Sequence, residues 1–243
     1  MEVAILSTLS TNSEPVLKPK KKKEFTYFTL LLFIVLGFGL QIIAGIGVAI
    51  YDEVTGSNMT GILLEGPYAL LVDAAFFLGV AVLYRPVRRF LKPMWNFSVL
   101  KERKTYVYIV VGFLIVAAVQ YVMLSFLNVE SADQQQKDLN QGSFNQTLLS
   151  SWIFFISVAV ITPIKEELLY RGVLCGFLTK RHHVLVGIFV SALVFGLLHI
   201  GFPITATVMG LVFAIIYYRT KSIFPSMILH MLWNGLVSIT VFF

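Results

Sequence analysis

The sequence predicts an all-α integral membrane protein with about seven transmembrane helices. Of its 243 residues, 57% are hydrophobic and only 13% are charged, whereas charged residues make up about 25% of an ordinary soluble domain. Apolar stretches long enough to cross a hydrocarbon core of about 30 Å recur along the chain. Lysine and arginine gather in alternate connections between these stretches, and acidic residues gather in the others. This asymmetry is the one that the positive-inside rule gives to polytopic membrane proteins.

We expect three parts: a basic cytoplasmic tail (1–24), a first membrane region of three helices (25–146) and a denser membrane core (147–243). The basic connections are assigned to the cytoplasm, which puts the amino end inside and the carboxyl end outside a cell membrane that the chain crosses several times. The predicted spans cover residues 26–50, 62–84, 105–127, 147–179, 184–200, 204–218 and 225–243.

The last four spans carry signs of close packing. The stretch 147–179 is longer than a straight crossing needs and contains Pro163, which is expected to kink the helix and free a backbone carbonyl. Small residues four apart, at Gly172 and Gly176 and again at Gly210 and Ala214, allow helices to approach closely in lipid.

The composition also excludes some classes of function. The net charge of +6 follows the predicted topology, so it indicates contact with lipid headgroups, and no nucleic-acid partner is expected. Cys175 is the only cysteine, which excludes an internal disulfide and a cysteine-based metal cluster. The sequence gives no prediction of oligomeric state.

The stretch KEELLYRG, residues 165–172, places charges inside an apolar run. A charge near mid-membrane costs roughly 2.5–3.5 kcal/mol on insertion scales, so such residues mostly face a protein interior or a wet cavity. On a helix, Glu167 and Arg171 lie one turn apart and are expected to pair. Glu166 points about 140° away from Arg171 at 100° per residue. Pairing therefore explains one carboxylate and leaves the other without a partner.

Two further stretches bring polar side chains into predicted spans. FGLLH runs from Phe195 to His199 at the end of the fifth span, and HMLWN runs from His230 to Asn234 in the seventh. A single histidine inside a membrane most often makes an interhelical hydrogen bond. Together with Glu166, however, these side chains favour a chemical site.

These residue types suit hydrolysis of an amide. A carboxylate can act as a general base on water, an imidazole can share its proton, and a second imidazole with an amide can donate to an oxyanion. The same Glu, His and His also resemble a metal site with one open position, although the H-E-x-x-H spacing of common zinc proteases is absent. A serine nucleophile fits less well, because Ser191 lies two turns from His199.

Glu166-Glu167 with Arg171, Phe195 with His199, and His230 with Asn234 resemble the EExxxR, FxxxH and HxxxN motifs of the CPBP family of intramembrane endopeptidases. That family includes the type II CAAX prenyl proteases and the Abi and bacteriocin-immunity proteins. The resemblance covers about residues 147–240, and residues 1–146 show none.

The resemblance implies an all-helical core, here 147–243, that cleaves a hydrophobic or membrane-tethered peptide in or near the bilayer. Glu166 would activate water with His199, while His230 and Asn234 would stabilise the oxyanion. Glu167, Arg171 and Phe195 would support them. No cofactor is expected, and the alternative is a divalent metal such as zinc held by Glu166, His199 and His230. The compact chain favours a bacterial source.

Two other functions remain open at this point. A non-catalytic membrane regulator or bacteriocin self-immunity protein of the same fold predicts that Glu166→Gln leaves the phenotype intact. A transporter predicts a flux that depends on a gradient, since embedded Glu and His also mark proton paths. Asp73, Gln41 and Gln120 lie within other predicted spans, and we expect Asp73 to have a buried partner.

One geometric difficulty accompanies the catalytic interpretation. At 1.5 Å per residue along straight helices, His230, Glu166 and His199 would lie roughly 13, 20 and 25 Å from the cytoplasmic side. Tilted, kinked or short helices must bring them level.

Overall fold

The computed structural model describes residues 25–65, 68–131 and 147–242, and this part of the chain contains helices and short connections without a strand. The predicted tail (1–24) and most of the predicted outer connection (128–146) lie outside the described residues. The all-α prediction is confirmed for the described part.

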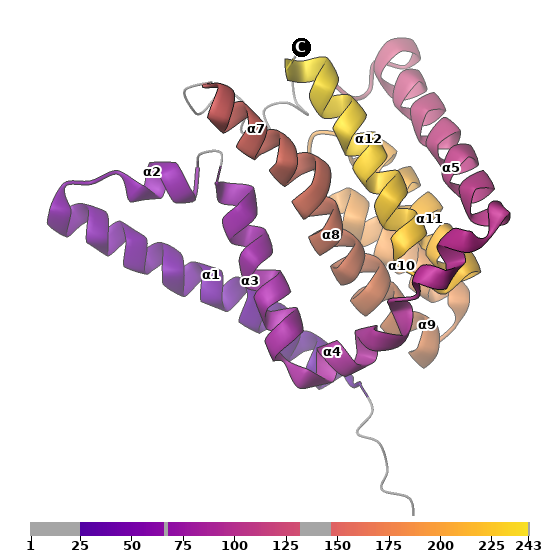
Figure 1. The fold of residues 1–243 in the computed structure, drawn as a ribbon, viewed down its shortest axis with the longest axis horizontal. Helices are drawn as coiled ribbons and strands as arrows, with labels where there is room; N and C mark the ends of the chain where they lie inside the picture. The colour runs from indigo at the N-terminus through magenta and orange to yellow at the C-terminus, as the bar shows by residue number, and fades with distance from the viewer. Residues whose placement is uncertain (1–24, 66–67, 132–146, 243) are drawn as a thin grey trace, which may run out of the picture.

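The first helices form an arm beside the rest of the molecule (Figure 1). Helix α1 (Tyr27–Thr55) begins where the Thr26 hydroxyl accepts the Thr29 N–H, and ends at Gly56, which has a φ of 70°. The Asp52 carboxylate accepts the backbone N–H groups of Met59 and Thr60 at 2.8 and 2.7 Å. It thereby joins α1 to α2 (Met59–Leu63), which is followed by α3 (Ala69–Leu83).

The basic connection between the predicted spans 62–84 and 105–127 is largely helical, which was not predicted. It folds into α4 (Arg85–Leu91) and two 3₁₀ turns, η1 (Lys92–Met94) and η2 (Phe97–Lys101). Its apolar residues explain the difference, because Val87, Leu91 and Met94 are almost fully buried in the core. Helix α5 (Arg103–Tyr121) follows and continues into the π-helical turn η3 (Val122–Phe126).

The segment around Pro163 is one long, irregular helix that runs beside α12 (Figure 1). It consists of α7 (Leu148–Ile156), the π-helical η4 (Ser157–Ile161), α8 (Thr162–Glu166), the π-helical η5 (Glu167–Cys175) and α9 (Gly176–Arg181). A π-bulge inside an α-helix is a feature found frequently at functional sites.

The last three helices are α10 (Val184–Leu197), α11 (Pro203–Thr220) and α12 (Phe224–Phe242). Helices α10 and α11 pack closely, since a Cβ added to Gly210 would lie 2.8 Å from the Ala192 Cα. The amino end of α11 is held by Glu130, whose Oε1 accepts the N–H groups of Ile204 and Thr205. The close packing predicted for this part of the chain is confirmed.

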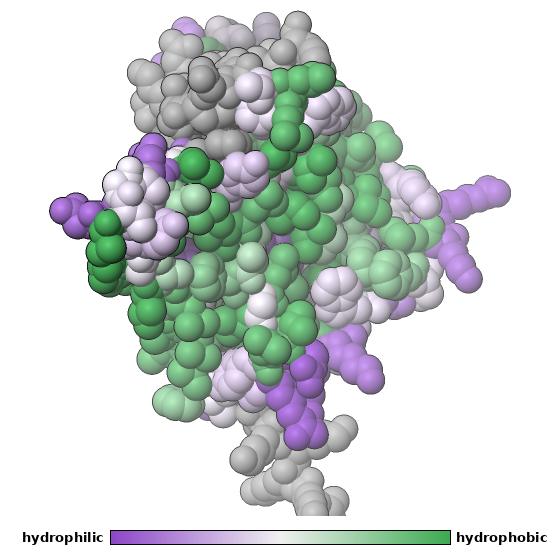
Figure 2. All heavy atoms as spheres, turned by 60° about the vertical axis from the view of Figure 1, so that its left-hand side comes forward, coloured by the Kyte–Doolittle hydropathy of each residue, from purple (hydrophilic) through white to green (hydrophobic). Residues whose placement is uncertain are grey.

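Helices occur at all seven predicted spans, but the count of seven transmembrane crossings is not established. Among the described residues, four helical stretches are long and apolar enough to cross a membrane, and a fifth qualifies if the pair Ala69–Leu83 and Arg85–Lys101, bent by 88°, counts as one span. Hydrophobic side chains cover much of the face in Figure 2, with hydrophilic ones gathered towards its edges. The four stretches are Tyr27–Thr55, Arg103–Phe126, Leu148–Arg181 and Pro203–Thr220.

Candidate active site

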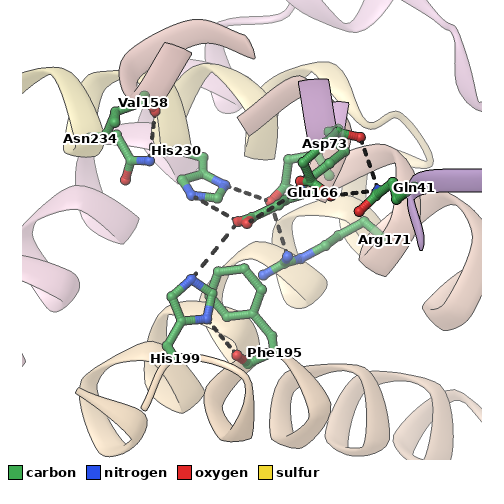
Figure 3. Close-up of polar contacts among 11 residues, drawn as sticks. Gln41, Asp73, Val158, Glu166, Arg171, Phe195, His199, His230 and Asn234 are labelled. Atoms are coloured by element: carbon green, nitrogen blue, oxygen red, sulfur yellow. Dashed lines mark hydrogen bonds and ion pairs between the residues drawn. The ribbon is translucent and has the colours of Figure 1, made fainter. Parts of the chain in front are cut away.

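Glu166 and both predicted histidines meet at one point in the second half of the chain (Figure 3). The Glu166 Oε2 atom lies 4.0 Å from the Nε2 atom of His199 and 3.8 Å from the Nε2 atom of His230. This oxygen is buried and makes no direct hydrogen bond to another described residue. The predicted mismatch in depth is therefore absent, since all three side chains converge.

His199 reaches the site because it lies beyond the end of α10 rather than in it. Its backbone N–H bonds the Gly196 carbonyl at 3.0 Å, and its own carbonyl accepts the Phe202 N–H at 3.1 Å. The ring Nδ1 lies 2.6 Å from the Phe195 carbonyl oxygen. Because a carbonyl can only accept, Nδ1 carries the proton and donates. In the neutral ring, the Nε2 atom that faces Glu166 is then an acceptor.

Glu167 and Arg171 form the ion pair that their spacing predicted. The Arg171 Nη1 lies 3.1 Å from the Glu167 Oε1, and both side chains are almost completely excluded from solvent. The guanidinium also lies 4.5 Å from the ring centroid of Phe195 and 4.9 Å from that of Phe213. Such contacts with aromatic faces stabilise a cation that is out of reach of water. Phe195 thus contacts the Arg171 guanidinium with its ring and the His199 ring nitrogen with its carbonyl.

His230 connects this ion pair to Glu166. Its Nδ1 lies 3.0 Å from the Glu167 Oε1, so it donates to the carboxylate that Arg171 also holds. Its ring lies against the Phe213 ring with centroids 4.8 Å apart. These contacts fix the ring so that Nε2 points towards Glu166 (Figure 3).

Asn234 lies one turn after His230, but its hydrogen bond goes to the backbone rather than to the ionisable residues. Its Nδ2 donates to the Val158 carbonyl at 3.0 Å. In η4 the Thr162 N–H bonds the Ser157 carbonyl, five residues back, and the next bond in this series would run from residue 163 to Val158. Pro163 has no N–H to make it. The freed carbonyl that Pro163 predicted is therefore confirmed, and Asn234 satisfies it.

A further polar group of three residues lies beside Glu166 and was not predicted as a unit. Lys165 forms an ion pair with the Oδ2 atom of Asp73 on α3, and the Gln41 Nε2 of α1 donates to the Asp73 Oδ1 at 2.8 Å. The expected buried partner of Asp73 is thus found. The sequence indicates this pairing only by placing an acid, Asp73, and a base, Lys165, inside two different predicted spans.

The alternative metal site would need Glu166, His199 and His230 to place their donor atoms around one point. Among residues 25–65, 68–131 and 147–242, no group of three His, Cys, Asp or Glu side chains is arranged to hold a metal ion. Both histidines nevertheless direct Nε2 towards the same Glu166 oxygen (Figure 3), so the chelator arm of the cleavage assay described below decides between water and metal.

Comparison with known proteins agrees with the resemblance predicted from the three motifs. Residues 148–236 match the family described as type II CAAX prenyl endopeptidase Rce1-like. The membrane-embedded CAAX protease MroQ of Staphylococcus aureus (strain USA300) is 32% identical over 149 residues, which are 57% of this chain and 60% of that protein. YdiL of Bacillus subtilis (strain 168), whose name places it among membrane peptidases, is 29% identical over 89 residues, 36% of each chain.

The chain thus spans between one third and three fifths of the length of these two relatives. No solved structure matches it significantly. The family match contains all seven motif residues from Glu166 to Asn234, whereas α1 to α5 lie outside it. The resemblance is confirmed for residues 148–236 of this membrane protein.

Proposed function

We propose that residues 148–236, which match the Rce1-like endopeptidases, form the catalytic core of an intramembrane endopeptidase. The substrate class is a hydrophobic or membrane-tethered peptide in a bacterial cell membrane, and the reaction is hydrolysis of one of its peptide bonds. The observation that carries the proposal is the Glu166 Oε2, which is buried, makes no direct hydrogen bond and faces two imidazoles.

The separations around this oxygen suit an activated water. Distances of 3.8–4.0 Å are too long for direct hydrogen bonds, and we place a bridging water between these groups. The Glu166 carboxylate and the neutral His199 Nε2 are both acceptors, so they cannot bond each other. A water between them donates one hydrogen to each and keeps a lone pair for attack. Glu166 then acts as the general base and His199 orients the water.

The proposed reaction forms no covalent bond between the substrate and the protein. The water oxygen bonds the peptide carbonyl carbon while its proton passes to Glu166, and the carbonyl oxygen becomes an oxyanion. Glu166 next returns the proton to the amide nitrogen, the C–N bond breaks, and an acid and an amine leave. The chemistry is balanced within the substrate, one water and the protein.

His230 is proposed as the oxyanion donor under one condition. Its Nδ1 proton is committed to Glu167, so Nε2 can donate only when the ring carries both protons. Asn234 uses one of its two amide hydrogens on Val158, and the second is proposed to assist the oxyanion.

The test is cleavage by the purified chain in detergent and in liposomes, using a peptide library with small hydrophobic precursors. Glu166→Gln and His199→Ala are compared with His183→Ala, which removes an exposed histidine outside the site. We expect the first two to lose about 10²–10⁴-fold in kcat, the range of general acid–base catalysis, and the control to keep its activity.

The same assay decides between this proposal and its alternatives. Activity that falls with chelator and returns with one divalent ion would assign the hydrolysis to a metal. Absence of cleavage, with Glu166→Gln still complementing a deletion strain, would assign a non-catalytic regulator or immunity role.

A further inference from the structure

Lys165 lies between two carboxylates and is bonded to only one of them. Its Nζ is in direct contact with the Asp73 Oδ2 and is 4.0 Å from the Glu166 Oε1. The three side chains are shielded, with exposed fractions of 13% for Lys165, 29% for Asp73 and 11% for Glu166. Attraction between charges in such a place is screened much less than at a surface.

Lys165 is able to bond either Asp73 or Glu166. The lysine ammonium is a compact charge on a flexible four-carbon stem, and a shift of little more than 1 Å would bring it into hydrogen-bond range of Glu166. Asp73 is fixed in place because the Gln41 amide donates to its other oxygen. The lysine is thus held on the α3 side of the site.

This choice matters for the chemistry, given the function proposed above. An ammonium bonded to Glu166 would occupy a lone pair of the base and stabilise its ionised form. Both effects weaken its ability to take a proton from water. A complete absence of Lys165 would instead leave Asp73 unpaired beside Glu166.

We propose that Asp73 is a positioning residue that holds Lys165 away from Glu166 and so keeps this carboxylate available as the general base. The inference rests on the proposed function and assigns a role to α1 and α3, which lie outside the matching family segment. The first membrane region therefore completes the site rather than only flanking it.

Other charged groups near Glu166 do not duplicate this role. Arg171 is committed to Glu167 and to two aromatic faces. Each imidazole facing Glu166 is held by the bond of its Nδ1, with its Nε2 3.8–4.0 Å from the Glu166 Oε2, so it lacks the freedom of the lysine stem to close on that carboxylate. The ionisable groups around Glu166 are Lys165, Glu167 and Tyr170 on its own long helix, His199 after α10, His230 on α12 and, through Lys165, Asp73 on α3.

The test is the kcat and KM of four variants for a cleaved peptide, measured on the monodisperse fraction of each protein. Asp73→Asn is expected to lower kcat by at least about tenfold with little change in KM, since general base catalysis as a whole contributes 10²–10⁴-fold. Adding Lys165→Met to Asp73→Asn removes the displaced ammonium and is expected to restore most of the lost kcat. Asp73→Glu keeps the pairing charge and is expected to retain most of it as well.

Lys180→Met is the matched control, because it removes another lysine of the same long helix that lies against Phe90 rather than Asp73. A double variant no faster than Asp73→Asn, or an Asp73→Glu as slow as Asp73→Asn, would overturn the inference. So would an Asp73→Asn protein with unchanged kcat. Wild-type protein that cuts no peptide, by contrast, contradicts the proposed function itself.

Discussion

Neighbouring carboxylates in this helix are expected to respond in opposite ways to the same substitution. Glu167→Gln removes the charge that faces Arg171 at 3.1 Å, where both side chains are almost fully buried. Removing one partner of a buried ion pair costs about 3–5 kcal/mol, because the other charge is left uncompensated. Glu166→Gln breaks no direct hydrogen bond, so its cost should stay below that of one hydrogen bond, about 1 kcal/mol.

The free energy of unfolding in mild detergent separates the two variants. In a chain of this size 1 kcal/mol shifts Tm by about 2–4 °C, so Glu167→Gln should lower Tm by on the order of 10 °C. Glu166→Gln should melt within a few degrees of wild type while losing its activity. A second substitution, Arg171→Met, should recover part of the stability of Glu167→Gln, since it removes the orphaned charge.

Equal losses of stability in the two single variants would refute this reasoning. That result would mean that Glu166 makes a stabilising hydrogen bond in the folded protein. Its position between the imidazoles would then have a structural role rather than a catalytic one. A Glu167→Gln protein as stable as wild type would equally refute it, since the charge on Arg171 would then have access to water.

Three further predictions test the remaining contacts. Asn234→Leu should cost about 1–3 kcal/mol on thermal unfolding by leaving the Val158 carbonyl unbonded, and Pro163→Ala in that background should reduce the cost by supplying an N–H. Gly210→Ala should destabilise the protein in the same assay, because its Cβ meets the backbone of Ala192, whereas Gly79→Ala, with open space around it, should be neutral or stabilising by up to about 1 kcal/mol. His230→Gln keeps a neutral Nε2 donor, so it should retain more kcat than His230→Ala in the peptide-cleavage assay.

Helical spacing was sufficient to predict the ion pair beside Glu166. Glu167 and Arg171 are four residues apart and pair as expected, and this pairing leaves Glu166 without that partner. The two motif histidines were singled out on other grounds, because few polar residues interrupt these apolar helices and because both match the family motifs. Local spacing carries such predictions since it depends only on residues within one turn.

Contacts between distant segments lay beyond that argument. Nothing in the local sequence of α12 indicates that Asn234 bonds Val158, since the acceptor exists only because η4 has a π-helical register at Pro163. The helices within the basic segment 85–104 were not predicted, because its many charged residues drew attention away from the apolar side chains that pack into the core. Straight-helix counting failed for His199 because the residue lies in the turn after α10.

Pro163 explains how the side chains of the site come to lie at the same depth. It frees a carbonyl on the long helix, and Asn234 takes it up from α12. One turn before Asn234, His230 is held by Glu167 on the far side of Pro163. Two hydrogen bonds therefore fix α12 against both ends of α8, the five-residue segment that carries Glu166. Because α12 is held at both points, the His230 ring is oriented with its Nε2 towards Glu166. The HxxxN spacing thus fixes α12 against the irregular helix at two points, and this brings together Glu166 and His230, the proposed general base and oxyanion donor.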